Sequence, residues 1–242
     1  MAYLLLMDTA EAVGSIALMS ATNGEVVYSA QNTDLKSHAV KIPSLIQEGL
    51  KALSIDMSSI EAVSISTGPG SYTGLRIGFS LAKGICLGGN IPLIGIPTLT
   101  AIKEGILQQV STITHHKTLI APMMDARRME VYTAFFDEKG QLLKAPFPHI
   151  LGEETFRLFE SYGVEKVILA GSGAAKLQIP EQLPYEVTVL DKLKAVKADF
   201  QQKLALEKWK AGEFEDLFHF EPLYLKEFQA KPSTKIKKLL NL

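Results

Sequence analysis

One stretch decides the fold of this chain: Gly68-Pro69-Gly70-Ser71-Tyr72-Thr73-Gly74-Leu75-Arg76-Ile77-Gly78. It follows a short apolar run, residues 62–65, that is typical of a buried strand, and it leads into a nearly charge-free helix extending to about Gly88. A loop rich in glycine and proline lets the backbone approach a ligand or partner closely, and it leaves helix N–H groups free to meet an anion. The stretch therefore predicts an α/β unit with a binding loop.

The helix after this loop carries small residues in two rows, each with a spacing of four. The rows are Gly74, Gly78 and Ala82, and then Ser80, Gly84 and Gly88. Glycine costs about 1 kcal/mol in a helix interior, so several glycines need a compensating reason. Close approach of another helix is the usual one. If one row faces the sheet of the same chain, we expect the other to be a surface for a partner, with Leu75, Phe79, Leu81 and Ile85 as the apolar residues between.

The composition is that of an ordinary globular protein. The 242 residues are 47% hydrophobic and carry a formal net charge of −1, which favours neither nucleic acid nor membrane as a partner of the whole surface. The single cysteine, Cys86, excludes a disulfide framework and a cysteine-based zinc site, and it fits a reducing cytoplasm. Residues 1–8 are too short for a signal peptide, and no apolar run approaches the roughly 20 residues that span a bilayer.

The predicted elements repeat in two halves. The first half has a strand at residues 3–7 closed by Asp8, a hairpin over 14–19 and 25–29, a helix at 37–53, and the strand before the glycine loop. The second half has a strand at 119–124 closed by Asp125, a hairpin over 130–136 and 141–143, a helix at 153–162, and a strand at 167–170 before Gly171-Ser172-Gly173. A strand at 93–96 and helices at 98–109 and 198–211 complete the prediction. The repeat indicates two related lobes around a cleft.

Asp8 and Asp125 are candidates for chemistry because both end predicted buried strands. Ligands bind at the carboxyl ends of strands in open α/β sheets, so two such carboxylates suit Mg²⁺ or phosphates. The plainer interpretation is that each aspartate caps a turn through local hydrogen bonds. Arg127 and Arg128 also have two interpretations. They could bind a phosphate or a carboxylate of a partner, or they could form ion pairs with Asp or Glu side chains of the same chain.

The sequence argues against several standard sites. The glycine loop does not fit G-x-x-x-x-G-K-[ST] or G-x-G-x-x-G, and Ser71 has no histidine nearby in sequence to act as a base. The five histidines have no metal-ligand spacing. The C-terminal lysines, at 231, 235, 237 and 238, suit RNA phosphates or an ordinary solvated helix end.

Five blocks of the sequence together carry a resemblance to a known family. They are Asp8-Thr9-Ala10 with its hairpin, the stretch from Gly68 to Gly78, Ala82-Lys83-Gly84, Asp125-Ala126-Arg127-Arg128-x-Glu130-Val131-Tyr132, and Pro222-Leu223-Tyr224-Leu225-Lys226. On these residues the chain resembles the bacterial TsaB family, also called YeaZ. The resemblance runs through most of the chain but is only generic over residues 147–218.

The resemblance implies an α/β, actin-like or sugar-kinase-like (ASKHA, RNase H-like) fold of two lobes, each a mixed sheet with helices. Residues 1–103 would form the N-terminal lobe with the partner-binding helices. Residues 104–219 would form a degenerate C-terminal lobe, and the tail at 220–242 would pack back on the N-terminal lobe.

The resemblance also implies a function. A TsaB protein is a noncatalytic scaffold subunit for threonylcarbamoylation (t6A) of adenosine 37 in tRNAs that read ANN codons, and it binds and activates the transferase TsaD. The implied partners are TsaD, TsaE, tRNA within the complex, and a second copy of the chain when TsaD is absent. No membrane is implied, the location is cytoplasmic, and no cofactor is resident, although ATP or ADP with Mg²⁺ is conceivable at the complex.

The family comparison also implies site residues. TsaD proteins carry two metal-binding histidines four residues apart, and by alignment Thr98 and Ile102 stand at those places, so we expect no catalytic and no metal residue here. The expected interface comprises Ser37, Lys41, Leu45, Gly74, Leu75, Gly78, Phe79, Leu81, Ala82 and Ile85. The expected nucleotide or phosphate contacts are Asp8, Thr9, Gly70, Ser71, Asp125 and Arg127. Arginine at position 78 or 82 is expected to abolish the complex without unfolding the chain.

Two other hypotheses come from the residues alone. One is an ATP- and Mg²⁺-binding phosphotransferase or ATPase that uses Asp8 and Asp125. The other is direct RNA binding through Arg127, Arg128 and the lysine-rich tail.

Overall fold

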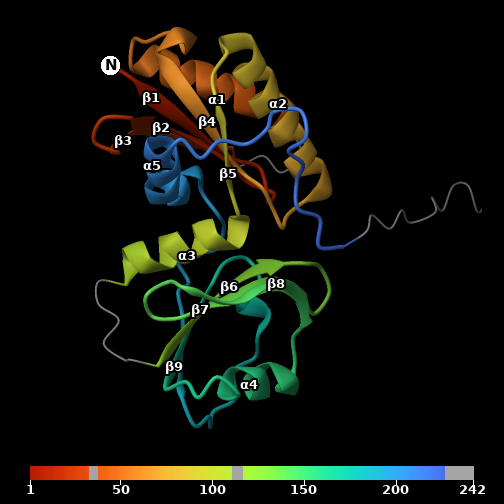
Figure 1. Cartoon of the computed structure of the whole chain (residues 1–242). Helices are drawn as coiled ribbons and strands as arrows, with labels where there is room; N and C mark the ends of the chain where they lie inside the picture. Colours follow the sequence, from red (N-terminus) through yellow and green to blue (C-terminus); the bar gives the residue numbers. More distant parts are fainter. Residues whose placement is uncertain (33–37, 111–116, 227–242) are drawn as a thin grey trace, which may run out of the picture.

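The computed structural model describes residues 1–32, 38–110 and 117–226, with the backbone alone at 38–40. Within this part, two five-stranded sheets lie one above the other, with helices outside and between them (Figure 1). The predicted pair of α/β lobes, each with a mixed sheet, is confirmed. Ser37 and the C-terminal lysines lie outside the described residues.

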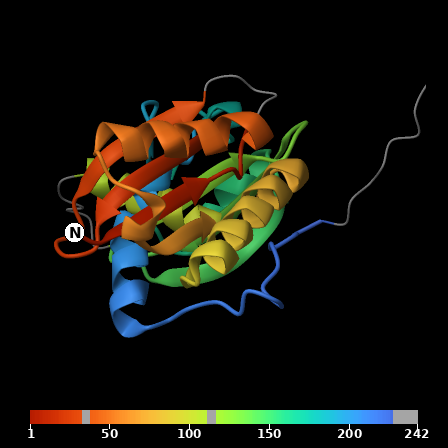
Figure 2. The ribbon, with the colours of Figure 1, turned by 90° about the horizontal axis from the view of Figure 1, so that it is seen from above.

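The first sheet has the strand order β3-β2-β1-β4-β5. Its strands are β1 (Tyr3–Asp8), β2 (Gly14–Ser20), β3 (Val26–Asn32), β4 (Ile60–Ser66) and β5 (Leu93–Ile96). Strand β1 lies in the centre, antiparallel to β2 and parallel to β4. Its six residues are all buried, which explains the continuous apolar run in the sequence. Helices α1 (His38–Ala52) and α2 (Tyr72–Gly89) cover one face side by side (Figure 2), and a short 3-10 helix, η1 (Met57–Ser59), precedes β4.

The second sheet repeats this topology in the order β8-β7-β6-β9-β10. Its strands are β6 (Thr118–Asp125), β7 (Glu130–Phe136), β8 (Leu142–Ile150), β9 (Lys166–Ala170) and β10 (Glu186–Val189). Strand β6 pairs antiparallel with β7 and parallel with β9, as β1 does with β2 and β4. Helix α4 (Glu153–Glu160) follows the hairpin, and a 3-10 helix, η2 (Ala174–Lys176), follows β9. The internal duplication predicted from the sequence is therefore real at the level of topology.

Three elements fill the space between the sheets: α3 (Thr98–Gln109), the 3-10 helix η3 (Ala198–Gln201) and α5 (Gln202–Ala211). One buried cluster joins both sheets through these elements, and it includes Leu6, Ile102, Ile120, Phe136, Ile168 and Phe200. The outer faces have separate cores. One lies under α1 and α2, and the other lies under α4. The layers thus alternate helix, sheet, helix, sheet, helix.

Three predicted elements differ clearly from the observed ones, and one observed strand was not predicted. The helix expected at 198–211 starts with the 3-10 turn η3, and the helix expected at 153–162 ends at Glu160. Strand β8 (Leu142–Ile150) continues well beyond the predicted 141–143 and includes Pro146 and Pro148. Both prolines are tolerated because β8 is the edge strand of its sheet, where an N–H group is not needed on the outer side. The short strand β10 was not predicted.

After α5 the chain returns over the first lobe. Residues 213–226, here called the C-terminal strap, cross the edge of β5 and then lie beside α2 (Figures 1 and 2). The backbone N–H of Glu215 donates to the carbonyl of Leu93 at 2.9 Å, and the N–H of Leu223 donates to the carbonyl of Thr67 at 2.8 Å. Among the helices of the described residues, none is long and apolar enough to cross a membrane.

Candidate functional site

Helix α2 is held by caps at both ends. The Ser71 hydroxyl accepts a hydrogen bond from the N–H of Gly74 at 3.3 Å, and Asn90 ends the helix in a left-handed conformation. The N–H of Ser71 itself donates to the carbonyl of Ala10 at 2.6 Å, which ties the glycine loop to the turn after β1. The helix therefore starts at a fixed place beside the end of β1.

The first small-residue row of α2 packs against the sheet of its own chain. A Cβ atom at Gly74 would overlap the carbonyl oxygen of Thr9, and one at Gly78 would overlap the Thr9 hydroxyl. Ala82 is fully buried. The prediction that these three residues contact a partner is wrong, because the close approach that requires small residues is to β1 and not to a foreign helix. The expectation that arginine at 78 or 82 leaves the fold intact is also wrong.

Two further predicted interface residues are covered by the protein itself. Leu75 is fully buried in the core between the sheets. Phe79 is 4% exposed, and its ring lies 5.3 Å from that of Phe220 in the C-terminal strap. The strap thus covers the flank of α2 that the sequence had assigned to a partner.

The second small-residue row remains open. Ser80, Gly84 and Gly88 are exposed, and a Cβ atom at either glycine would meet nothing within 4 Å. Leu87 beside them is 56% exposed. Four other predicted interface residues border this row, namely Leu81 and Ile85 on α2 and Lys41 and Leu45 on α1, each exposed or half-buried. We call these residues together the open face of α1 and α2.

Asp8 does not face a cleft. It is fully buried, its carboxylate accepts hydrogen bonds from the Ser66 hydroxyl and from the N–H of Ala10 at 3.1 Å, and burial raises its pKa to about 7. The Gln201 amide closes the space beside it, donating to Ser66 Oγ at 2.9 Å and to the Met7 carbonyl at 2.7 Å. A carboxyl with these neighbours caps a turn inside the core, so the plainer interpretation of Asp8 is correct.

Glu11 joins the two lobes. Its carboxylate accepts hydrogen bonds from the Ser172 hydroxyl in the second glycine loop and from the N–H of Val196 at 2.8 Å. Ser172 also accepts from the N–H of Asp125 at 3.0 Å, so the turns after β1 and β6 are connected through this loop. Burial raises the pKa of Glu11, and Asp125 adds to that rise. No sequence pattern pointed to Glu11, because its partners lie more than 160 residues away.

Asp125 and Arg127 lie at the exposed turn between β6 and β7. Asp125 accepts from the N–H of Arg127 at 2.5 Å and forms an ion pair with Lys176. The structure therefore separates the two strand-end aspartates by environment, since Asp8 is buried and Asp125 is 44% exposed at its side chain. Of the other predicted phosphate contacts, Gly70 packs on Ala10, and the Thr9 hydroxyl has no hydrogen-bond partner within the described residues.

The residues at the expected TsaD metal position do not fit a metal. Thr98 and Ile102 are fully buried in α3, and the Thr98 hydroxyl accepts from the N–H of Gly68 at 3.0 Å. Isoleucine has no donor atom, and the threonine oxygen is used to fix the glycine loop. In the described part of the chain, no group of three or more His, Cys, Asp or Glu side chains is arranged to hold a metal.

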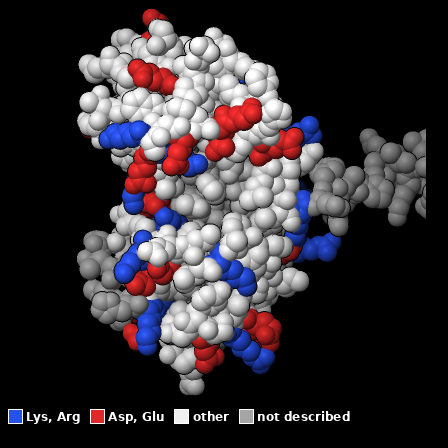
Figure 3. Space-filling model, in the orientation of Figure 1, with Lys and Arg blue, Asp and Glu red and all other residues white. Residues whose placement is uncertain are grey.

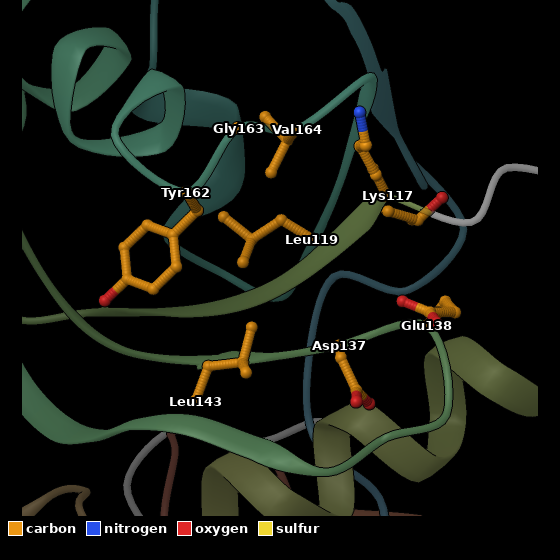
Figure 4. Close-up of a pocket in the computed structure, with 9 residues that line it drawn as sticks. Lys117, Leu119, Asp137, Glu138, Leu143, Tyr162, Gly163 and Val164 are labelled. Atoms are coloured by element: carbon orange, nitrogen blue, oxygen red, sulfur yellow. The ribbon is translucent and has the colours of Figure 1, made fainter.

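A hollow of about 420 Å³ lies in the second lobe (Figure 4). Leu119, Leu143 and Tyr162 gather on one side of it, and Lys117 and Glu138 lie on the other. None of the predicted site residues lines this hollow.

The two matched lobes and the layered order of sheets and helices define a protein of the actin-like, two-lobed (ASKHA) class. The solved structure of YeaZ from Pseudomonas aeruginosa has the same fold, with a TM-score of 0.71 over 93% of this chain and all of that one, at 20% identity. Residues 25–231 match the family model described as TsaD: tRNA N6-adenosine threonylcarbamoyltransferase. The chain belongs to this family.

Relatives in two bacteria carry the description "tRNA threonylcarbamoyladenosine biosynthesis protein TsaB". The Escherichia coli K12 protein is 32% identical over 139 residues, which is 57% of each chain. The Bacillus subtilis 168 protein is 30% identical over 146 residues, which is 60% of this chain and 59% of the relative. The matched stretch thus spans less than two thirds of the length of these relatives.

Proposed function

We propose that this protein is a noncatalytic subunit in the threonylcarbamoylation of adenosine 37 of tRNA, and that it acts by binding and activating the transferase TsaD. The relatives are described as biosynthesis proteins for this modification, and the family model carries the name of the transferase. The pattern of donor atoms supports a noncatalytic role, because Asp8 is buried and Thr98 and Ile102 offer no metal ligands.

One observation carries the proposal: α2 has one small-residue row buried in its own lobe and a second row open to solvent. Packing among the described residues does not explain Gly84 and Gly88, since a Cβ atom at either position would meet no described atom within 4 Å. Each costs about 1 kcal/mol in a helix interior. A partner helix that approaches the backbone over Ser80, Gly84 and Gly88, with Leu87 as an apolar anchor, would offset this cost.

Activation then results from differential affinity. A subunit shifts its partner toward an active conformer only if it binds that conformer more tightly than the others. Under this proposal, the open face of α1 and α2 docks on TsaD, and the rigid packing of α2 against β1 keeps that face in one shape. The same face would serve a second copy of the chain when TsaD is absent, so the homodimer and the TsaD complex compete. Under this proposal TsaE and tRNA belong to the assembled complex in the cytoplasm, and this chain holds no resident cofactor.

The test is Gly84→Arg, which fills the open row without touching the sheet. We expect the variant to fold, because arginine is a better helix former than glycine, and to lose co-elution with purified TsaD in size-exclusion chromatography. The control is Gly152→Arg in the second lobe, where a side chain also meets nothing within 4 Å. A folded Gly84→Arg protein that still co-elutes with TsaD would refute the proposed interface.

The phosphotransferase hypothesis has no support in the site. Asp8 is surrounded by Ser66, Ala10 and Gln201 and is not open to a phosphate. Calorimetry of the isolated chain with ATP and Mg²⁺ checks this, and we expect no heat of binding at millimolar nucleotide.

A further inference from the structure

The turn between β6 and β7 holds two arginines in an unfavourable backbone conformation. Arg127 has φ 71° and Arg128 has φ 49°, both in the left-handed region that favours glycine and asparagine. Non-glycine residues there cost of order 1 kcal/mol each, and such residues cluster at functional sites. Both side chains are exposed, and within the described residues neither guanidinium has a hydrogen bond or an ion pair.

Lys176 holds this turn in place and neutralises the Asp125 carboxylate. The Lys176 ammonium pairs with the Asp125 carboxylate and donates to the carbonyls of Arg128 at 2.7 Å and Glu130 at 3.2 Å. The Asp125 carboxylate at this turn is therefore already compensated by Lys176. Two guanidinium charges remain available at a turn that cannot easily change shape.

The end of the C-terminal strap adds cations and aromatic rings beside the turn. Lys226 pairs with Glu130 and lies 5.9 Å from the centre of the Tyr132 ring. Two residues earlier, Tyr224 packs on Tyr72 of α2 with ring centres 5.0 Å apart.

The Tyr72 ring also carries the guanidinium of Arg76 at 5.2 Å, and the exposed Glu221 near Tyr224 offsets that charge in part. The resulting basic strip comprises Arg76, Arg127, Arg128, Lys176 and Lys226, and it crosses from the first lobe to the second. Figure 3 shows blue side chains gathered at the edge of the molecule where the described chain ends.

We propose that the basic strip binds the phosphate backbone of an RNA, with the Tyr72 and Tyr224 rings as faces for an unstacked base. This inference rests on the proposed function and deepens it, because it gives this chain its own contact with the tRNA. Guanidinium groups bind phosphate oxygens in a two-pronged geometry, and the turn presents two of them next to each other in the sequence. Interleaved aromatic rings and cations are typical of surfaces for single-stranded nucleic acid.

The test removes the charges while preserving the turn. Arg127→Asn with Arg128→Gly gives the pair that left-handed turns favour, so the variant should fold at least as well as the wild type. The matched control, Lys139→Gln with Arg157→Gln, removes two exposed charges elsewhere in the second lobe. The probe is an unmodified tRNA transcript, titrated with each isolated protein over about 50–200 mM salt.

We expect the wild type to bind with a Kd of about 1–100 μM near physiological salt, with tighter binding at lower salt and the usual loss of affinity as salt rises. The turn variant should bind at least about tenfold more weakly, and its salt slope should fall by about 2, since each phosphate contact contributes about 0.7–0.9. The control should keep the wild-type slope. Equal slopes for the two double variants, or no binding by the wild type, would overturn the inference.

Two further arms separate this inference from its alternatives. The wild-type protein should not bind vesicles of anionic phospholipid. If it bound these vesicles through Arg127 and Arg128 but did not bind tRNA, the inference would also be overturned. The turn variant should still co-elute with TsaD, because Arg127 and Arg128 lie in the second lobe, apart from the open face of α1 and α2. Loss of tRNA binding with TsaD retained distinguishes this surface from the one in the proposed function.

Discussion

The two lobes share one sheet topology but differ in the helix that comes after each glycine loop. The first loop leads into α2, a helix of 18 residues, and the second leads into η2, a 3-10 helix of three residues. The strand-end aspartates differ as well, since Asp8 is buried under Gln201 and Asp125 is exposed beside Lys176. The sheets are thus the common part, and each lobe's surface depends on the helices laid over it.

This difference explains why the first lobe is the one that we expect to bind TsaD. A long helix with two small-residue rows can press one row on its own sheet and offer the other outward. The second lobe has no such helix within the described residues, and its exposed apolar side chains, such as Met129, Leu142 and Ile150, lie on turns and on the edge strand β8. Substitutions in α2, at the two aspartates, in the strap and at the joint between the lobes test this contrast.

The largest effect is expected from Gly74→Ala in α2. The new Cβ would overlap the Thr9 carbonyl oxygen, which is backbone and cannot rotate away, so the helix must move off the sheet. We expect a loss of at least about 3 kcal/mol in the free energy of unfolding, measured by chemical denaturation. Gly84→Ala, the same change on the open row, should gain about 1 kcal/mol. Similar stabilities for the two variants would show that the two small-residue rows do not differ in how closely they pack on the rest of the chain.

The second effect concerns the buried aspartate. Because burial raises the pKa of Asp8 to about 7 from 3.8, the folded protein holds a proton that the unfolded chain has released within that pH range. Stability therefore falls as pH rises through this window, by about 2–3 kcal/mol between about pH 5 and pH 8. Asp8→Asn should remove most of the fall in denaturation experiments, and Glu11, whose pKa burial also raises, should account for the rest.

Asp125→Asn is the matched control in the other lobe. Its side chain is 44% exposed and lies outside the buried site of Asp8, so this change leaves the Asp8 carboxyl in place and the fall in stability with pH should persist. If Asp125→Asn flattened the pH dependence and Asp8→Asn did not, the assignment of the two environments would be reversed.

The sequence predicted the sheets better than the surfaces. Strands β5 and β7 and helix α3 have the bounds that the apolar periodicity predicted, because each has a buried face and clear flanking turns. The duplication was visible because both halves place an aspartate after a buried strand and glycines after another. Strand β10 was missed because its residues are half-exposed and carry no continuous apolar run.

The site was predicted only in part, for a physical reason. Spacing shows that Gly74 and Gly78 share a face of α2, but not which face meets the sheet, and that choice depends on Thr9 across the core. Long-range partners leave no local pattern either. The contacts of Gln201 with Met7 and Ser66 join residues more than 130 positions apart, so the burial of Asp8 was not predictable.

A smaller effect is expected from Phe220→Ala in the C-terminal strap. The ring packs on Phe79 and against Gly95, so its loss should expose the flank of α2 and cost about 2 kcal/mol in the free energy of unfolding. Phe218→Ala is the control within the same strap, because that ring is 78% exposed and its removal should change stability by less than about 0.5 kcal/mol. Equal effects would mean that the strap does not depend on this contact.

The smallest effect is the coupling between the lobes themselves. The Glu11 carboxylate accepts from the Ser172 hydroxyl across the joint, so a double-mutant cycle with Glu11→Ala and Ser172→Ala should give a coupling energy of about 1 kcal/mol. Ser172→Ala combined with Glu138→Ala, which lies in a distant turn, should be additive within about 0.5 kcal/mol. Coupling in the first pair alone would mean that the two lobes are joined by a specific contact at their glycine loop as well as by the shared core. If the effects were additive in both pairs, the buried cluster around α3 alone would hold the two lobes together.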